Sequence, residues 1–203
     1  MYLVCLDLEG VLVPEIWIAF SEATGIPELR RTTKDEPDYD KLMGERIALL
    51  HRHGLGLKEI QKVISGIEPM EGAREFLDTL RRETQVVILS DTFTQFAGPL
   101  MEKLGMPTIF CNTLLADEDG TVTGYRMRVS HSKLTAVKAL QSAGYKVIAS
   151  GDSFNDLEMI RAAEAGFLFK CPEPIALANP DLEVYNEYDE LLAAIRKIMA
   201  AED

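Results

Sequence analysis

The sequence of 203 residues is short of several features, and each shortage excludes a class of protein. Its cysteines, Cys5, Cys111 and Cys171, are too few and too scattered for a disulfide framework or a zinc site. Lys and Arg total 21 against 33 Asp and Glu, and the net charge of -12 argues against a nucleic-acid partner, because phosphate backbones require concentrated positive charge. No apolar run approaches the roughly 20 residues of a membrane span, and no basic leader precedes the first apolar run. We therefore expect a cytoplasmic protein with no membrane partner.

Hydrophobic residues make up 47% of the chain, which is ample for a sizeable core. Short apolar runs typical of buried strands lie at residues 2–6, 85–89, 108–111, 145–150, 166–169 and 183–185. Helical patterns separate most of them, at residues 71–82, 95–104, 133–142, 157–165 and 187–201. This alternation predicts an α/β fold with a doubly wound, mostly parallel, Rossmann-like sheet. Residues 114–129 predict a small β-hairpin flap with its turn at 117–120.

Residues 14–68 contain no strand-like run and show helical patterns instead, from residue 16 to about 24, at 38–53 and at 57–64. An all-helical segment inserted after the first strand of an α/β fold predicts a cap above the carboxyl edge of the sheet. Such lids exclude water from a reacting centre and select the substrate. We therefore predict a core domain of residues 1–13 and 69–203 and a helical cap domain of residues 14–68.

Polar residues follow three of the predicted strands, and another begins a predicted helix. They are Asp7 and Glu9; Ser90 and Asp91; Asp152, Asn155 and Asp156; and, at the helix start, Lys133. Because open parallel sheets bind ligands at the carboxyl ends of their strands, we expect these side chains to share one crevice. Carboxylates without a histidine or cysteine partner suit Mg²⁺, which prefers oxygen ligands. An aspartate can attack phosphorus and a second acid can carry the proton, so the pattern predicts Mg²⁺-dependent phosphoryl transfer through Asp7.

These residues resemble, in order and position, the four signatures of the haloacid dehalogenase superfamily of phosphatases and phosphotransferases. The signatures are matched by Asp7-Leu8-Glu9-Gly10-Val11, by Ser90, by Lys133 and by Gly151-Asp152-Ser153-Phe154-Asn155-Asp156. The resemblance implies that Asp7 is the nucleophile and Glu9 the general acid/base. It also implies that Mg²⁺ is held by Asp7, the Glu9 backbone carbonyl and Asp152. The phosphate would be held by Ser90, Lys133 and Asn155, and the loop anchored by Asp156.

The helical insertion between the first and second signatures resembles that of the phosphoserine phosphatases. This resemblance implies O-phosphoserine as substrate, with Glu15 binding its ammonium and Arg46 its carboxylate. The planar guanidinium of an arginine suits a carboxylate, because it can donate two parallel hydrogen bonds. Arg30 and Arg31 are alternative partners for the same carboxylate.

Two residues depart from the pattern. Glu9 stands where the family usually has aspartate, and Asp91 follows the serine where phosphoserine phosphatases have glycine. The carboxylate of Asp91 should repel phosphate unless a cation lies between them, and the ammonium of a second amino-acid molecule would serve. These features resemble superfamily members that also transfer the phosphoryl group to homoserine. A plain phosphatase for phosphoserine or another small phosphate ester is the alternative.

A signalling module is an alternative from a different class. Receiver-type domains also surround a phosphorylated aspartate with acids and a lysine, but that hypothesis predicts about 120 residues and no lid. The helical insertion at residues 14–68 argues against it. A homodimer is an additional hypothesis that no residue pattern supports.

Overall fold

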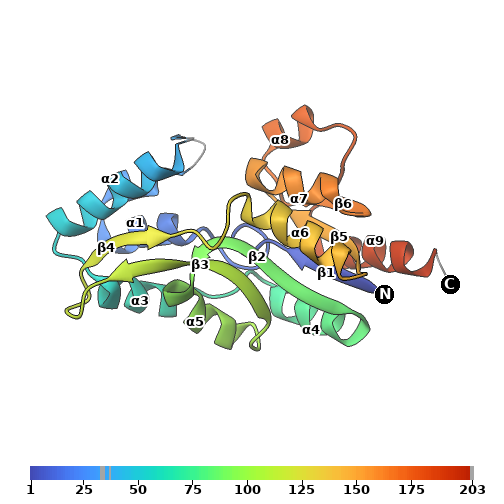
Figure 1. The fold of residues 1–203 in the computed structure, drawn as a ribbon, viewed down its shortest axis with the longest axis horizontal. Coiled ribbons are helices and arrows are strands. Elements are labelled where there is room, and N and C mark those ends of the chain that lie inside the picture. The colour runs from blue at the N-terminus through green and yellow to red at the C-terminus, as the bar shows by residue number, and fades with distance from the viewer. Residues whose placement is uncertain (33–34, 37, 202–203) are drawn as a thin grey trace.

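The computed structural model describes residues 1–32, 35–36 and 38–201, and it confirms the predicted fold class (Figure 1). A seven-stranded sheet has the order β4-β3-β2-β1-β5-β6-β7, in which only β4 pairs antiparallel, with β3. The strands are β1 (Tyr2–Leu6), β2 (Gln85–Phe93), β3 (Thr108–Ala116), β4 (Val122–Arg126), β5 (Lys146–Gly151), β6 (Ala165–Phe169) and β7 (Glu183–Tyr185). The central position of β1 places its carboxyl end between those of β2 and β5.

Some helices cover the two faces of this sheet, and others lie beyond its carboxyl edge. They are α1 (Ile16–Thr24), α2 (Tyr39–Arg52), α3 (Leu57–Ser65), α4 (Ala73–Glu83), α5 (Thr94–Lys103), α6 (Ser132–Ser142), α7 (Leu157–Ala162), α8 (Glu173–Ala178) and α9 (Tyr188–Ala200), with 3-10 turns η1 (Pro27–Arg30) and η2 (Phe154–Asp156). The sequence predicted neither η1 nor α8, because each is too short to show a helical period. The helix predicted at 157–165 ends at Ala162, since β6 begins three residues later.

Strand β1 shows why the core has two layers. Val4, Cys5 and Leu6 are fully buried, and successive side chains of a strand point to opposite faces. Val4 and Leu6 join the cluster that contains α4, α5 and α9, whereas Leu3 and Cys5 join the cluster that contains α6, α7 and α8. A strand covered on both faces must be apolar throughout, which explains the continuous apolar run before Asp7.

The helices of residues 14–68 lie beyond the carboxyl edge of the sheet, on the left in Figure 1. Within the described residues of this segment there is no strand. Aromatic rings join it to the rest of the chain: Trp17 of α1 lies 5.8 Å from Phe96 of α5, and Tyr39 of α2 lies 5.5 Å from Tyr125 of β4. The predicted hairpin is formed by β3 and β4. Strand β4 also contacts α2, near the carboxyl edge of the sheet.

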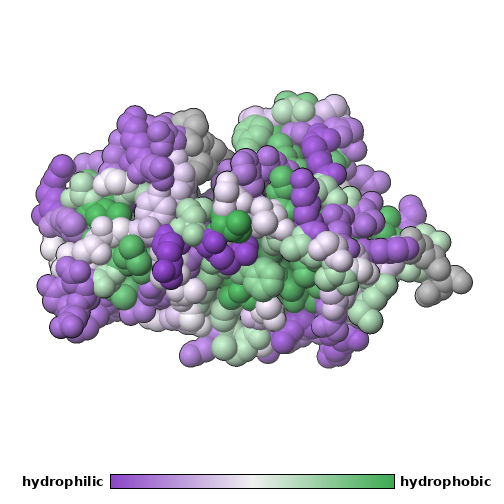
Figure 2. All heavy atoms as spheres, in the orientation of Figure 1, coloured by the Kyte–Doolittle hydropathy of each residue, from purple (hydrophilic) through white to green (hydrophobic). Residues whose placement is uncertain are grey.

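The outer surface mixes hydrophilic and hydrophobic residues on the face shown in Figure 2, and hydrophilic ones dominate over α2. Among the described helices, none combines the length and the apolar character that a membrane crossing requires. The large apolar side chains concentrate instead between the helices and the sheet.

Two leucines test how far stability depends on this core. We expect Leu77→Ala, in the fully buried stripe of α4, to lower the free energy of unfolding by about 2–5 kcal/mol. The matched substitution Leu177→Ala, at a side chain that is 72% exposed on α8, should change it by less than about 0.5 kcal/mol. Urea unfolding measures both values. Equal effects at the two positions would contradict the assignment of the core.

Candidate active site

The carboxyl ends of β2, β1 and β5 lie side by side and bring together residues far apart in the sequence. Asp7 directly follows β1, Asp152 directly follows β5, and Ser90 lies within β2, which continues to Phe93 rather than ending at residue 89. All three side chains are buried. The predicted crevice therefore exists at the edge where parallel sheets bind ligands.

Lys133, the second residue of α6, carries the positive charge of this crevice. Its Nζ lies 2.9 Å from Oδ1 of Asp7 and 2.6 Å from Oδ1 of Asp156. Burial by itself lowers the pKa of Lys133, but the two carboxylates outweigh that effect and raise its pKa well above its usual range. The ammonium is thus permanently charged and joins β1 to the loop after β5.

Asp7 is buried among charges of both signs. Burial raises the pKa of Asp7 well above its usual range, and the neighbouring Asp156 raises it further, while Lys133 acts in the opposite direction. Oδ1 accepts the hydrogen bond from the amide of Leu8 at 2.7 Å as well as that of Lys133. Among the described residues no donor reaches Oδ2, so one oxygen of Asp7 keeps its lone pairs available.

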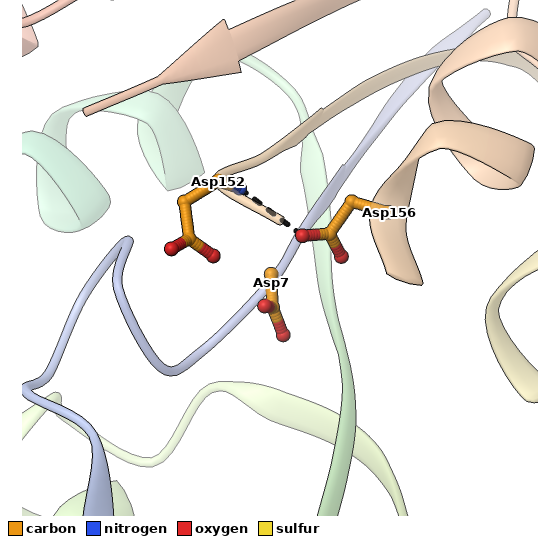
Figure 3. Close-up of side chains that lie close together, drawn as sticks. All are labelled: Asp7, Asp152 and Asp156. Atoms are coloured by element: carbon orange, nitrogen blue, oxygen red, sulfur yellow. Dashed lines mark hydrogen bonds between the residues drawn. The ribbon is translucent and has the colours of Figure 1, made fainter. Parts of the chain in front are cut away.

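Asp156 uses both of its oxygens to fix the loop that follows β5. Oδ1 accepts from Lys133. Oδ2 accepts from the amide of Asp152 at 3.1 Å (Figure 3) and from the amide of Ser153 at 2.9 Å. The hydroxyl of Ser153 donates to the same oxygen at 2.9 Å. The absence of a side chain at Gly151 makes this approach possible, because a Cβ there would lie 2.2 Å from Cγ of Asp156. Asp156 therefore positions the loop.

The donor set fits a divalent cation with a preference for oxygen. Carboxylate oxygens of Asp7, Asp152 and Asp156 lie within 4.8 Å of one another, and all three residues are buried (Figure 3). Buried carboxylates so close together repel one another unless a cation compensates. Since Asp156 is saturated by its hydrogen bonds, Asp7 and Asp152 are the carboxylates that suit Mg²⁺.

Gly10 makes room for the carboxylate of Asp152. Its φ is +78°, a conformation that residues with a side chain rarely adopt, and a Cβ at this position would lie 2.4 Å from Cγ of Asp152. The turn after β1 therefore needs glycine for its backbone and for the space that Asp152 occupies.

The side chains of Glu9 and Glu15 lie close enough to interact. Oε2 of Glu9 accepts the amide hydrogen bond of Ile16 at 2.9 Å. Burial raises the pKa of Glu9 to about 8, with the charge of Glu15 adding to the rise, while the Ile16 amide and Arg46 oppose it. A carboxyl group in such surroundings can hold a proton near neutral pH and deliver it to a neighbouring atom.

Arg46 of α2 supplies a second buried cation, and it comes from the helical segment. Its guanidinium carbon lies 4.4 Å from the centre of the Trp17 ring, and one of its terminal nitrogens donates to the carbonyl of Arg31 at 2.7 Å. Burial lowers its pKa to about 10, so it remains charged at neutral pH. Its Nε is buried without a hydrogen-bond partner among the described residues.

A cavity of about 100 Å³ collects nearly all of the predicted site residues. Its lining includes Asp7, Glu9, Glu15, Arg46, Ser90, Asp91, Lys133, Asp152 and Asn155. The remaining predicted residue, Asp156, lies behind this wall and is fully buried. The alternative arginines lie outside the cavity: Arg30 forms an ion pair with Glu22, and Arg31 forms one with Glu45.

The cavity also has lining residues that the sequence analysis did not assign to it, among them Trp17, Tyr39 and Thr92. Tyr39 lies seven residues before Arg46 and thus on the same helical face, and Thr92 lies two residues after Ser90 on the same strand. The spacing from Arg46 could have identified Tyr39 as a lining residue, and the spacing from Ser90 could have identified Thr92.

Several known proteins are similar to this chain over most of its length. The family model of haloacid dehalogenase-like hydrolases matches residues 2–164. A phosphoserine phosphatase of Pseudomonas syringae pv. tomato is 52% identical, covering 92% of this chain and 79% of that protein. Phosphoserine phosphatase ThrH of Pseudomonas aeruginosa is 51% identical, covering 94% of this chain and 93% of that protein. A solved phospho-aspartyl intermediate analogue of a phosphoserine phosphatase shares the fold, with a TM-score of 0.78 at 22% identity over 95% of this chain and 98% of that one.

Gly10→Ala tests the space that Asp152 requires. We expect it to remove most of the thermal stabilisation that Mg²⁺ gives the wild type, because the new Cβ would displace the Asp152 carboxylate. Gly25→Ala is the matched control: its φ is +69° but its Cβ would meet nothing within 4 Å, so it should cost only about 1–2 kcal/mol of backbone strain and keep the Mg²⁺ effect. A full Mg²⁺ shift in Gly10→Ala would contradict the role given to Asp152.

Proposed function

The chain belongs to the haloacid dehalogenase-like hydrolases, and on that basis we propose that it hydrolyses O-phosphoserine through an aspartyl phosphate on Asp7 and also passes the phosphoryl group to homoserine. One observation carries this proposal: Asp7 meets Lys133 and Asp152 in a cavity that Glu15 and Arg46 also line. The two relatives at 51% and 52% identity, both named phosphoserine phosphatases, support it. A homodimer and a cytoplasmic location stay predictions from the sequence.

Residues 14–68 serve in this proposal as the cap of a core formed by residues 1–13 and 69–203. The segment contributes Glu15 and Arg46 to the lining of the cavity. Arg46 binds the substrate carboxylate, and its buried, unpartnered Nε supports this role because a guanidinium can donate two parallel hydrogen bonds to a carboxylate. Glu15 binds the ammonium. The ion pairs of Arg30 and Arg31 with glutamates outside the cavity favour Arg46 over them.

Mg²⁺ is the cofactor that the donor set suits. Asp7, Asp152 and the backbone carbonyl of Glu9 would hold it, and when bound it supplies positive charge that offsets the charge of the phosphoryl oxygens. Lys133 contributes a further positive charge beside Asp7, and Ser90 and Asn155 would donate hydrogen bonds to the phosphoryl group.

The residues of the cavity account for both halves of the reaction. An oxygen of Asp7 attacks phosphorus, the bond from phosphorus to the serine oxygen breaks, and Glu9 gives its proton to that oxygen. In the second half Glu9 takes a proton from water or from the hydroxyl of homoserine, whose oxygen attacks the phosphorus. The bond to Asp7 then breaks, and its electron pair returns to the carboxylate.

The direct test incubates the protein with Mg²⁺ and O-phosphoserine, with and without homoserine, and quantifies phosphate and phosphohomoserine. We expect both products from the wild type, and a loss on the order of 10⁴-fold in Asp7→Asn, because the amide is a poor nucleophile. Asp117→Asn, in the exposed hairpin turn, is the matched control and should keep full activity. Chelation of Mg²⁺ should abolish both products.

Phosphate without phosphohomoserine would reduce the protein to a plain phosphatase. Products that persist in Asp7→Asn would exclude the aspartyl phosphate on this residue.

The carboxylate partner is tested by conservative substitution. Arg46→Lys should raise KM for O-phosphoserine about 10-fold or more, because lysine keeps the charge but loses the paired hydrogen bonds. Arg30→Lys, at a residue whose ion pair is exposed, should leave KM within about twofold. Steady-state kinetics measure both. A rise in KM confined to variants of Arg30 or Arg31 would transfer the role to those residues.

A further inference from the structure

Arg46 is a buried cation that has no carboxylate partner in the described part of the chain. The residue is buried, and none of the ion pairs between described residues includes it. Burial lowers its pKa to about 10, although the charges of Glu9 and Glu15 oppose that effect. Because a buried charge is costly unless other groups stabilise it, Arg46 needs a stabilising contact of another kind.

Trp17 of α1 supplies that contact through the face of its ring. The guanidinium carbon of Arg46 lies over the indole at 4.4 Å from the ring centre, within the range of a cation–π interaction. The face of an aromatic ring attracts a cation through its quadrupole. A carboxylate partner would instead occupy the N–H groups of the guanidinium, which a bound ligand needs for its own hydrogen bonds.

The N–H groups of Arg46 have few partners within the protein, and those partners are neutral. One terminal nitrogen donates to the carbonyl of Arg31 at 2.7 Å, and the other lies 3.7 Å from the sulfur of Met43. The Nε has no hydrogen-bond partner among the described residues. The guanidinium is thus held by a ring, a carbonyl and a thioether, and it keeps a buried donor for a ligand.

The ring of Trp17 is itself held by two other aromatic rings. Phe20 of α1 meets it at 6.0 Å and Phe96 of α5 at 5.8 Å, both edge to face. Helix α5 begins at the residue that follows β2, and β2 carries Ser90. Trp17 therefore connects Arg46, from the helical segment, to the strand that contributes to the phosphate site. Trp17 lines the cavity, whereas Phe20 and Phe96 do not.

We propose that Trp17 is a positioning residue that makes the cavity selective for phosphate esters bearing a carboxylate, because its ring holds the charged guanidinium of Arg46 at a fixed place beside the phosphate site. The inference rests on the proposed function, in which Arg46 binds the substrate carboxylate. It assigns the selectivity to a pair of side chains and not to Arg46 alone. An ester with the same phosphate and ammonium groups but no carboxylate gains nothing from the pair.

Two substrates that differ only in the carboxylate test this role. O-phosphoserine and O-phosphoethanolamine are each hydrolysed with Mg²⁺, and the preference is the ratio of their kcat/KM values. We expect the wild type to prefer O-phosphoserine about 100-fold or more, because paired hydrogen bonds between two charged groups are strong. Trp17→Leu should lower the preference about 10-fold, through a higher KM for O-phosphoserine at a kcat within about threefold of the wild type. Trp17→Phe keeps an aromatic face and should restore most of the preference.

Two controls separate positioning from a loss of stability. Leu77→Ala destabilises the core outside the cavity and should leave the preference at the wild-type value. In an Arg46→Met background, Trp17→Leu should cause no further loss of preference, since the ring acts through the guanidinium. An unchanged preference in Trp17→Leu would overturn the proposal. So would an equal loss in Leu77→Ala, or a further 10-fold loss in the Arg46→Met background.

Fluorescence provides a second measurement in a protein that retains Trp17. The sequence contains one tryptophan, so the intrinsic emission reports this ring alone. In Asp7→Asn with Mg²⁺, saturating O-phosphoserine should change the emission more than saturating O-phosphoethanolamine, because only the former brings a carboxylate to the guanidinium over the ring. Adding Arg46→Met should remove the difference. Identical changes with both ligands in Asp7→Asn would overturn the proposal even if Trp17→Leu does not fold.

The outcomes also separate this inference from the function on which it rests. If the wild type releases no phosphate from O-phosphoserine with Mg²⁺, the proposed function fails and the role of Trp17 fails with it. If it hydrolyses both esters equally well, catalysis by Asp7 stands, and carboxylate recognition by Arg46 and Trp17 is refuted. If it prefers O-phosphoserine and Trp17→Leu keeps that preference, only the role of Trp17 is refuted.

Discussion

The buried contacts of Lys133 with Asp7 and Asp156 are the interaction on which the rest of this site depends. Removing charges from water is costly, and burial is tolerated only where partners are close and the remaining hydrogen bonds are made. Here the ammonium satisfies one oxygen of each aspartate, and the second oxygen of Asp156 is satisfied by the loop after β5. One lysine thereby ties together the end of β1, the start of α6 and the loop that carries Asp152.

The order of the parallel strands converts these local contacts into a crevice. Because β1 lies between β2 and β5, the residues that follow or end these strands meet without any long loop. Two glycines permit the close packing. Gly10 leaves space for the carboxylate of Asp152, and Gly151 leaves space for that of Asp156. The apolar layers on both sides of β1 hold this edge rigid, which keeps the carboxylates at fixed separations.

Charge is distributed in two zones across the site. In the cavity, buried cations from opposite sides, Lys133 and Arg46, surround the acids, an arrangement suited to a substrate that carries phosphate and carboxylate groups. In the adjoining groove, which is bounded by residues of α2, α6, η2 and α7, three carboxylates line the wall together with one lysine and one histidine. Asp91 lies at the boundary between the two zones. Membership of the haloacid dehalogenase-like hydrolases rules out the alternative of a phosphorylated signalling module.

The sequence by itself determined the α/β fold class, most of the elements and the strand ends that Asp7 and Asp152 follow, because the period of apolar residues fixes strand and helix, and parallel strands present their carboxyl ends at one edge. The strand predicted to end before Ser90 continues to Phe93 in the structure. The tertiary structure alone decided which residues of the helical segment reach that edge. Arg46 and Tyr39 line the cavity, whereas Arg30 and Arg31 do not, and the groove beside Asp91 exists only where α2 faces α6 and η2. The spacing of residues along a chain indicates which face of a helix or strand each residue occupies. It does not state which distant element packs against that face, since this depends on the combined shape and charge of both surfaces.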